Sequence, residues 1–251
     1  MQSEMRILLL LLAIPIYMSF TLEDPTFKDS QLEHYTVFQA YRDQGEEAFA
    51  KLKAKDVDHF QCDILLRAFK FEEDLEVWAK NKNDSIYKLI TTYKFCSNVG
   101  ELGPKRKEGD KQIPEGYYIL SKFNPKSTYF LSLKINYPNA SDSVFADKST
   151  PGGMIFIHGG CNTIGCIPIT DKWIKELYVF CVEAANGGLE DIPVQIFPAR
   201  LTDENYSLLK KQFSDPKLHD FWGQLKEGYD LFDANKNLPT YSITENGEYL
   251  F

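Results

Sequence analysis

The stretch MIFIHGGCNTIGCIPITD, residues Met154 to Asp171, holds one of the chain's four histidines and two of its five cysteines. His158 ends an apolar run, and Cys166 follows a glycine-rich turn. A thiolate attacks a carbonyl carbon far better than a thiol does, so a catalytic cysteine needs a nearby base such as an imidazole. The pattern therefore predicts Cys166 as a nucleophile and His158 as its general base.

The turn between these two residues is suited to acyl chemistry. Its glycines, Gly159, Gly160 and Gly165, allow positive φ angles and a close approach of the backbone to a substrate. The backbone N–H groups of Gly165 and Cys166 are candidate oxyanion-hole donors for a tetrahedral intermediate. The hydroxyl of Thr163 is placed to fix the turn.

Two other interpretations use the same residues. A metal site would combine His158, Cys161 and Cys166, and His59 with Cys62 forms a second His-x2-Cys pair. No fourth ligand follows the first set closely, and zinc sites usually combine paired short spacings, so we expect no metal. A Cys161–Cys166 disulfide is the other alternative, and it would silence the nucleophile.

Composition excludes some classes of protein. The chain has 251 residues, is 43% hydrophobic and carries a formal net charge of −8. These values fit a packed globular protein and argue against a nucleic-acid binder, which needs a basic face for phosphates. The sequence has no phosphate-binding Gly-Lys-Ser/Thr loop and no Gly-x-Gly-x-x-Gly, so we expect no organic cofactor.

The N-terminus resembles a secretory signal. Arg6 precedes an apolar run from Ile7 to Tyr17, which is too short to span a bilayer. We therefore predict a signal peptide over 1–20, export to the periplasm or cell envelope, and no integral membrane segment after processing. An odd number of cysteines in an exported protein leaves at least one thiol unpaired.

The expected organisation is a helical lead-in, a β-rich domain and a helical extension. The lead-in spans 21–62, with a capping box of Ser30 and Glu33, and Gly45 as the break between two short helices. The extension spans 201–251, where two amphipathic runs and a short terminal strand follow each other.

The central part, 63–200, is predicted to be largely antiparallel. LEVWAK and IYKLITTYKF flank the turn cluster NKNDS, and EGYYILSKF and TYFLSLKINY flank NPKS, which gives two hairpins. GGMIFIHGG and IPVQIFPA are further strands. One helix, capped by Asp171 and carrying Cys181 on its buried face, interrupts them. The fold class is mainly β with flanking helices (α+β).

The same motifs resemble the L,D-transpeptidase (YkuD) family, in which a strand ending in His-Gly leads to a Ser/Thr-x-Gly-Cys turn. This chain has His158-Gly159 followed by Thr163–Cys166. The YafK branch is the most similar, because the segments Leu102–Leu120 and Phe123–Asp142 also resemble its Gly-Pro-Lys and Tyr-Pro-Asn-Ala motifs. The resemblance covers about Leu65–Ala199.

The resemblance implies a YkuD-type catalytic domain that acts on peptidoglycan stem peptides, or on a protein attached to the wall. Cys166 would form a thioester with His158 as base, the Gly159 carbonyl would orient the imidazole, and Gly165 would help bind the oxyanion. Hydrolysis by an amidase or endopeptidase with the same residues stays open. A non-catalytic wall-binding protein is a further alternative.

Two departures from the wider family concern substrate binding. Ile164 stands where a second histidine is common, and Pro168 where an arginine is common, and the YafK branch shares both. We predict substrate contacts from Thr163, Lys105 and Tyr117. The alternatives are a solvated, self-neutralised loop for Lys105 and an ordinary half-buried strand position for Tyr117.

Overall fold

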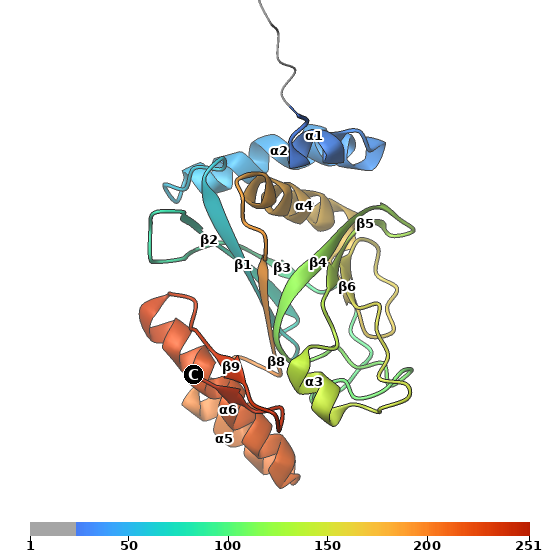
Figure 1. The fold of residues 1–251 in the computed structure, drawn as a ribbon, viewed down its shortest axis with the longest axis vertical. Coiled ribbons are helices and arrows are strands. Elements are labelled where there is room, and N and C mark those ends of the chain that lie inside the picture. The colour runs from blue at the N-terminus through green and yellow to red at the C-terminus, as the bar shows by residue number, and fades with distance from the viewer. Residues whose placement is uncertain (1–23) are drawn as a thin grey trace, which may run out of the picture.

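A computed structural model describes residues 24–251 (Figure 1). The predicted signal peptide over 1–20 lies outside the described residues. Within residues 24–251, no helix has the length and apolar character needed to cross a membrane.

The described chain forms one large curled sheet with helices on both sides. The helices are α1 (Phe27–Leu32), α2 (Tyr35–Lys53), α3 (Ala140–Phe145), α4 (Thr170–Asn186), α5 (Asp203–Gln212) and α6 (Pro216–Asn235). The strands are β1 (Cys62–Phe69), β2 (Asp74–Asn81), β3 (Lys88–Lys94), β4 (Gly116–Ser127), β5 (Phe130–Ile135), β6 (Phe156–His158), β7 (Ile167–Pro168), β8 (Pro193–Phe197), β9 (Ser242–Ile243) and β10 (Tyr249–Leu250).

The large sheet has the strand order β3-β2-β1-β8-β4-β5-β6-β7. Its pairs are antiparallel except β1 with β8 and β6 with β7, which confirms the mainly antiparallel prediction. Both predicted hairpins form, as β2–β3 and β4–β5. The second turn lies later than predicted, because β4 continues through NPKS to Ser127, which pairs with Phe130 across a bulged register.

The N-terminal helices begin and break at other residues than predicted. Thr26 caps α1, and its side chain and that of Asp29 form a reciprocal capping box. The predicted box of Ser30 and Glu33 is therefore wrong, since α1 has already begun when Ser30 is reached. Gly45 is buried inside α2 and does not separate two helices, because the break comes earlier, where α1 ends at Leu32 and α2 starts at Tyr35.

Helix α4 lies between α2 and the sheet, and two buried carboxylates hold it there. Glu176 accepts hydrogen bonds from Lys51 Nζ at 2.7 Å and from Tyr93 Oη at 2.6 Å. Glu183 accepts one from Tyr41 Oη at 2.7 Å. Since these donors come from α2 and β3, the lead-in is attached to the sheet through polar contacts as well as through the main core.

On the other side of the sheet, α6 covers a second core in which strand and helix side chains mix. Lys70, just after β1, forms a fully buried ion pair with Glu115 at 2.9 Å. Trp222 on α6 donates its indole N–H to the other oxygen of Glu115 at 2.8 Å. The C-terminal extension is thus packed directly on the sheet.

A residue that follows one edge strand of the large sheet contacts the other edge strand. β3 is one edge strand and β7 is the other. Cys96, two residues beyond the end of β3, donates its backbone N–H to the carbonyl of Pro168 in β7 at 2.9 Å. A main-chain hydrogen bond therefore joins the segment after β3 to β7, next to the residues predicted to do chemistry.

Candidate active site

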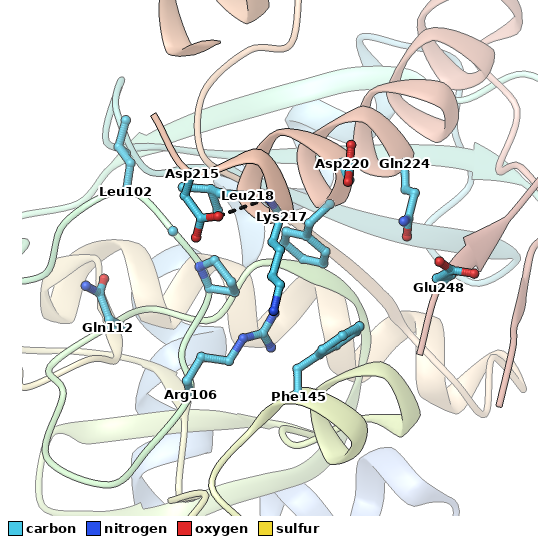
Figure 2. Close-up of a pocket in the computed structure, with 13 residues that line it drawn as sticks. Leu102, Arg106, Gln112, Phe145, Asp215, Lys217, Leu218, Asp220, Gln224 and Glu248 are labelled. Atoms are coloured by element: carbon cyan, nitrogen blue, oxygen red, sulfur yellow. Dashed lines mark hydrogen bonds between the residues drawn. The ribbon is translucent and has the colours of Figure 1, made fainter. Parts of the chain in front are cut away.

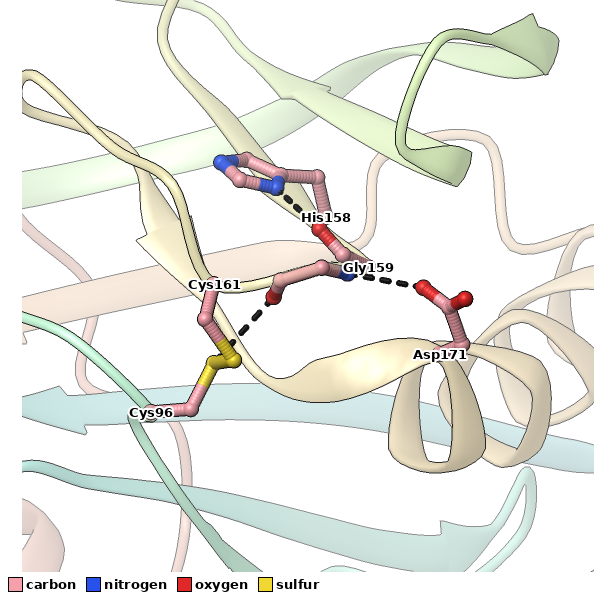
Figure 3. Close-up of a disulfide and its surroundings, with 6 residues drawn as sticks. Cys96, His158, Gly159, Cys161 and Asp171 are labelled. Carbon is pink, nitrogen blue, oxygen red and sulfur yellow. Dashed lines mark hydrogen bonds between the residues drawn. A yellow bond between two sulfur atoms is a disulfide. The ribbon is translucent and has the colours of Figure 1, made fainter.

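His158 is the last residue of β6 and is held by the strands on both sides. It pairs with Ser132 of β5 and Pro168 of β7, and its exposed fraction is 2%. Its Nδ1 lies 2.5 Å from the carbonyl oxygen of Gly159 (Figure 3), and the ring of Tyr129 stacks on the imidazole at 4.5 Å. A carbonyl only accepts hydrogen bonds, so Nδ1 carries the hydrogen and Nε2 keeps a lone pair.

Burial sets the protonation of both predicted catalytic groups. It lowers the pKa of His158 below its usual 6.5, although the hydrogen bond to Gly159 opposes this. Burial also raises the pKa of the Cys166 thiol above its usual 9, against the opposing effects of a backbone hydrogen bond at Phe156 and the charge of Lys105. The resting site therefore contains a neutral imidazole and a thiol, not an ion pair.

Thr163 holds the turn that carries Cys166. Its Oγ1 accepts the N–H groups of Cys166 at 2.8 Å and Gly165 at 3.2 Å, and donates to the Cys166 carbonyl at 2.9 Å. Gly165 has φ of +127°, and a Cβ there would lie 2.8 Å from the carbonyl oxygen of Gln112. The turn thus requires glycine, and both amides predicted as oxyanion donors are directed at the Thr163 hydroxyl.

Cys166 opens onto two cavities. One, of about 410 Å³, is also lined by His158 and Thr163. The other, of about 480 Å³, is also lined by Lys105. Met154 and Ile164 line both, with exposed fractions of 66% and 77%, so Cys166 lies between two cavities with an apolar rim.

The structure separates the remaining predicted substrate residues. Lys105 lines the second cavity, but its exposed fraction is 4% and its Nζ lies 2.6 Å from Asp110 Oδ1, so its charge is neutralised within the loop. Tyr117 is buried in the second core and donates its hydroxyl to the Leu225 carbonyl at 3.0 Å. It lines neither cavity at Cys166.

A larger cavity, of about 630 Å³, is lined by neither Cys166 nor His158; Figure 2 shows the residues around it. It is formed by the loop around Arg106, by α3 and by α6. The Arg106 guanidinium lies 5.2 Å from the ring of Phe145 and 5.5 Å from that of Phe221. Its lining contains the basic side chains of Arg106 and Lys217 and the acidic side chains of Asp215, Asp220 and Glu248, so both signs of charge face it.

The disulfide alternative weighed from the sequence is wrong in its pairing. Cys161 is bonded to Cys96 (Figure 3), with 5.4 Å between their Cα atoms. Cys166 is a free thiol. The fold brings Cys96 beside the turn. Because 65 residues separate Cys96 from Cys161 in the sequence, the pattern of the sequence alone does not indicate this pair. The other free thiols of the described residues, Cys62 and Cys181, are buried.

Asp171 contributes to the site in a way that the sequence did not reveal. The sequence predicts it as the cap of α4, but the N-cap residue is Ile169 and no side chain caps the helix. Asp171 Oδ1 instead accepts the N–H of Gly160 at 2.7 Å. A Cβ on Gly159 would lie 2.6 Å from this oxygen and 2.5 Å from the carbonyl oxygen of Tyr129, so only glycine fits there.

Within residues 24–251, no group of three or more histidine, cysteine or acidic side chains is placed to hold a metal ion. At the second His-x2-Cys pair, the His59 ring stacks on Phe49, and the thiol of Cys62 contacts the His59 carbonyl oxygen at 3.6 Å.

Comparisons with known proteins find relatives of this chain in sequence and in structure. The chain is 36% identical over 189 residues to a protein of Escherichia coli described as "Putative L,D-transpeptidase YafK", and the match covers 74% of this chain and 73% of that protein. Among solved structures, the helical cell shape determining protein Pgp2 from Campylobacter jejuni is 17% identical, with a TM-score of 0.44 over 74% of each chain. Bd1075 from Bdellovibrio bacteriovorus is 23% identical, with a TM-score of 0.39 over 57% of this chain and 50% of that one. No protein-family model matches the chain.

Proposed function

Because this chain belongs to the L,D-transpeptidase family, we propose that it is an exported cysteine acyltransferase acting on the stem peptides of peptidoglycan. The observation that carries the proposal is the placement of a free thiol and an oriented neutral imidazole on one cavity. Cys166 and His158 line it together, and the Gly159 carbonyl fixes the imidazole with Nε2 available. General-base activation of a thiol requires a base with a free lone pair at the same site, and this cavity has both groups on its lining.

The proposed reaction has two halves. As Sγ of Cys166 attacks the carbonyl carbon of a stem peptide, Nε2 of His158 takes the thiol proton. The tetrahedral intermediate then collapses to a thioester, and the imidazolium gives its proton to the leaving amine. In the second half His158 deprotonates an incoming amine, which attacks the thioester and restores the thiol.

The resting protonation states support a proton transfer that accompanies attack. Burial favours the uncharged form of both groups, so a stable thiolate–imidazolium pair is not the starting state. An oxyanion formed at this site needs donors. For the amides of Gly165 and Cys166 to serve, the Thr163 hydroxyl has to release at least one of them as the intermediate forms.

Two cavities at one nucleophile favour transfer over hydrolysis. One hollow can hold the acyl donor while the other holds the accepting amine. Thr163 and Lys105 remain in the proposal as substrate contacts, since each lines one of these cavities. Tyr117 does not, because it lines neither. Water in place of the acceptor amine would make the same site an amidase or endopeptidase.

The disulfide supports export. Bonds between cysteines persist in oxidising compartments and are rare in a reducing cytosol. A Cys96–Cys161 bond is therefore what a periplasmic or envelope protein can maintain. A bridge to Cys161 is one way in which a non-catalytic wall-binding protein could lose its thiol, and Cys161 is bonded to Cys96 instead.

The test is incubation of purified muropeptides with the wild type, Cys166→Ala and Cys62→Ala, followed by mass spectrometry. Cys62→Ala is the matched control, because it removes a buried thiol away from both cavities. We expect cross-linked or exchanged peptides from the wild type and Cys62→Ala, and none from Cys166→Ala. Products of water addition alone would assign hydrolysis, and equal activity of Cys166→Ala would remove Cys166 as the nucleophile.

A further inference from the structure

Cys96 touches the catalytic turn on both sides of Cys166. Its sulfur is bonded to Cys161, which precedes the nucleophile, and its backbone N–H is bonded to Pro168, which follows it. The Cys96 sulfur also lies 3.1 Å from the Gly160 carbonyl oxygen. One residue at the end of an edge strand therefore holds both ends of the segment that carries the nucleophile.

The disulfide is the covalent part of this attachment. Thr163 ties the turn to itself, and Asp171 ties Gly160 to α4. Neither contact joins the turn to the segment after β3. Among the contacts described above, the disulfide and the main-chain hydrogen bond of Cys96 make that connection. Without the disulfide, the main-chain hydrogen bond to Pro168 and the weak contact of the Cys96 sulfur with the Gly160 carbonyl would be what remains of this attachment.

Resting on the proposed function, we propose that the Cys96–Cys161 disulfide positions the catalytic turn, so that reducing it slows acyl transfer at Cys166. The disulfide thereby makes the activity dependent on a thiol–disulfide balance. The bond can be reached, since Cys161 is exposed and Cys96 is half-buried. A dithiol would supply two electrons and two protons, ending as a cyclic disulfide while Cys96 and Cys161 become thiols.

The two reactivities of Cys166 should change in opposite directions when the bond is broken. Alkylation by a small reagent needs only an accessible thiolate, and loosening the turn reduces the burial that holds the Cys166 pKa up. Acyl transfer needs Sγ aligned with His158, and a displacement of about 1 Å costs on the order of 10²-fold in rate. Global unfolding would instead also expose Cys62 and Cys181.

The experiment compares the oxidised wild type, the wild type reduced with dithiothreitol and then desalted, and the double variant Cys96→Ser with Cys161→Ser. Each is treated with iodoacetamide at pH 7, and modified cysteines are identified by mass spectrometry. The rate constant at Cys166 is measured beside kcat and KM on muropeptides. Reduction of the folded wild type covers the case in which the double variant fails to fold.

We expect the reduced protein and the double variant to be alkylated several-fold faster at Cys166 while Cys62 and Cys181 stay unmodified. We expect kcat to fall at least tenfold with KM changed less, and reoxidation to restore the reduced wild type. Unchanged alkylation and kcat after removal of the bond would overturn the proposal. If no preparation turns over muropeptides, the proposed function fails, yet the alkylation rate still decides whether the bond positions the turn.

Discussion

Replacing Thr163 by valine should cost this protein both stability and turnover. Valine matches the shape of threonine but removes the hydroxyl that accepts two N–H groups and donates to one carbonyl within the turn. A protein hydrogen bond contributes about 0.5–1.5 kcal/mol net, which gives about 1.5–4.5 kcal/mol for three. The turn is partly exposed, so water replaces part of the loss, and we expect about 2 kcal/mol.

The same 2 kcal/mol, if lost from the productive arrangement of Cys166, corresponds to a decrease of about 30-fold in kcat/KM. Urea unfolding measures the first quantity, and muropeptide turnover with mass-spectrometric detection measures the second. Thr163→Ser is the matched control, because it keeps the hydroxyl, and it should stay within a few-fold of the wild type.

The alternative outcome for Thr163→Val is equally informative. The Gly165 and Cys166 amides now donate to Thr163, so removing the hydroxyl also frees them for an oxyanion. If the valine variant turned over faster than the wild type, Thr163 would restrain the oxyanion donors and not hold the nucleophile in place. That result would refute the reasoning above.

Three further predictions concern pH and packing. Burial lowers the His158 pKa, so kcat/KM should fall on acidification with a midpoint below pH 6.5 as the base becomes protonated, and a midpoint above 6.5 in the pH–rate profile would contradict this. Gly159→Ala should abolish turnover, because its Cβ would lie 2.6 Å from Asp171 Oδ1. Gly153→Ala is the control and should be tolerated, because a Cβ there meets nothing within 4 Å. Equal activities of the two variants would show that the close packing at Gly159 does not matter for turnover. Burial raises the pKa of Asp142 from 3.8 to about 6, so the protonated form is favoured on folding, and this residue's contribution to stability is present below pH 4 and lost as pH rises through 6. The loss of stability is about 3 kcal/mol at 1.36 kcal/mol per pKa unit. Urea unfolding at pH 4 and at pH 6.5 measures it, and the difference in unfolding free energy between these two pH values should be smaller for Asp142→Asn than for the wild type.

The sequence predicts well those features that local pattern determines. Alternating faces and turn clusters locate both hairpins, and amphipathic periodicity places α4, α5 and α6. Cys181 lies on the buried face of α4 as predicted. The sequence also identifies the candidate site, because His158, Cys166 and the glycine-rich turn between them lie within one short stretch.

Features that depend on how the sheet curls could not be predicted in this way. Cys96 reaches Cys161 because the segment that follows β3 hydrogen-bonds to Pro168 of β7, and no local signal in either segment shows this. Asp171 has the usual chemistry of a helix cap, yet the backbone places it inside the first turn, where its carboxylate meets Gly160. The sequence is compatible with Tyr117 as part of a pocket wall, but α6 covers that face of β4 and accepts the Tyr117 hydroxyl at Leu225.

The buried cluster of Lys70, Glu115 and Trp222 makes the C-terminal extension a structural necessity of the domain and not a removable module. Trp222 satisfies a carboxylate whose other oxygen neutralises a fully buried ammonium group. A chain shortened to residue 200 would leave that carboxylate oxygen unpaired and would uncover Phe69 and Phe197, which the extension buries. Engineering that grafts this candidate site onto another scaffold should therefore carry 201–251 with it.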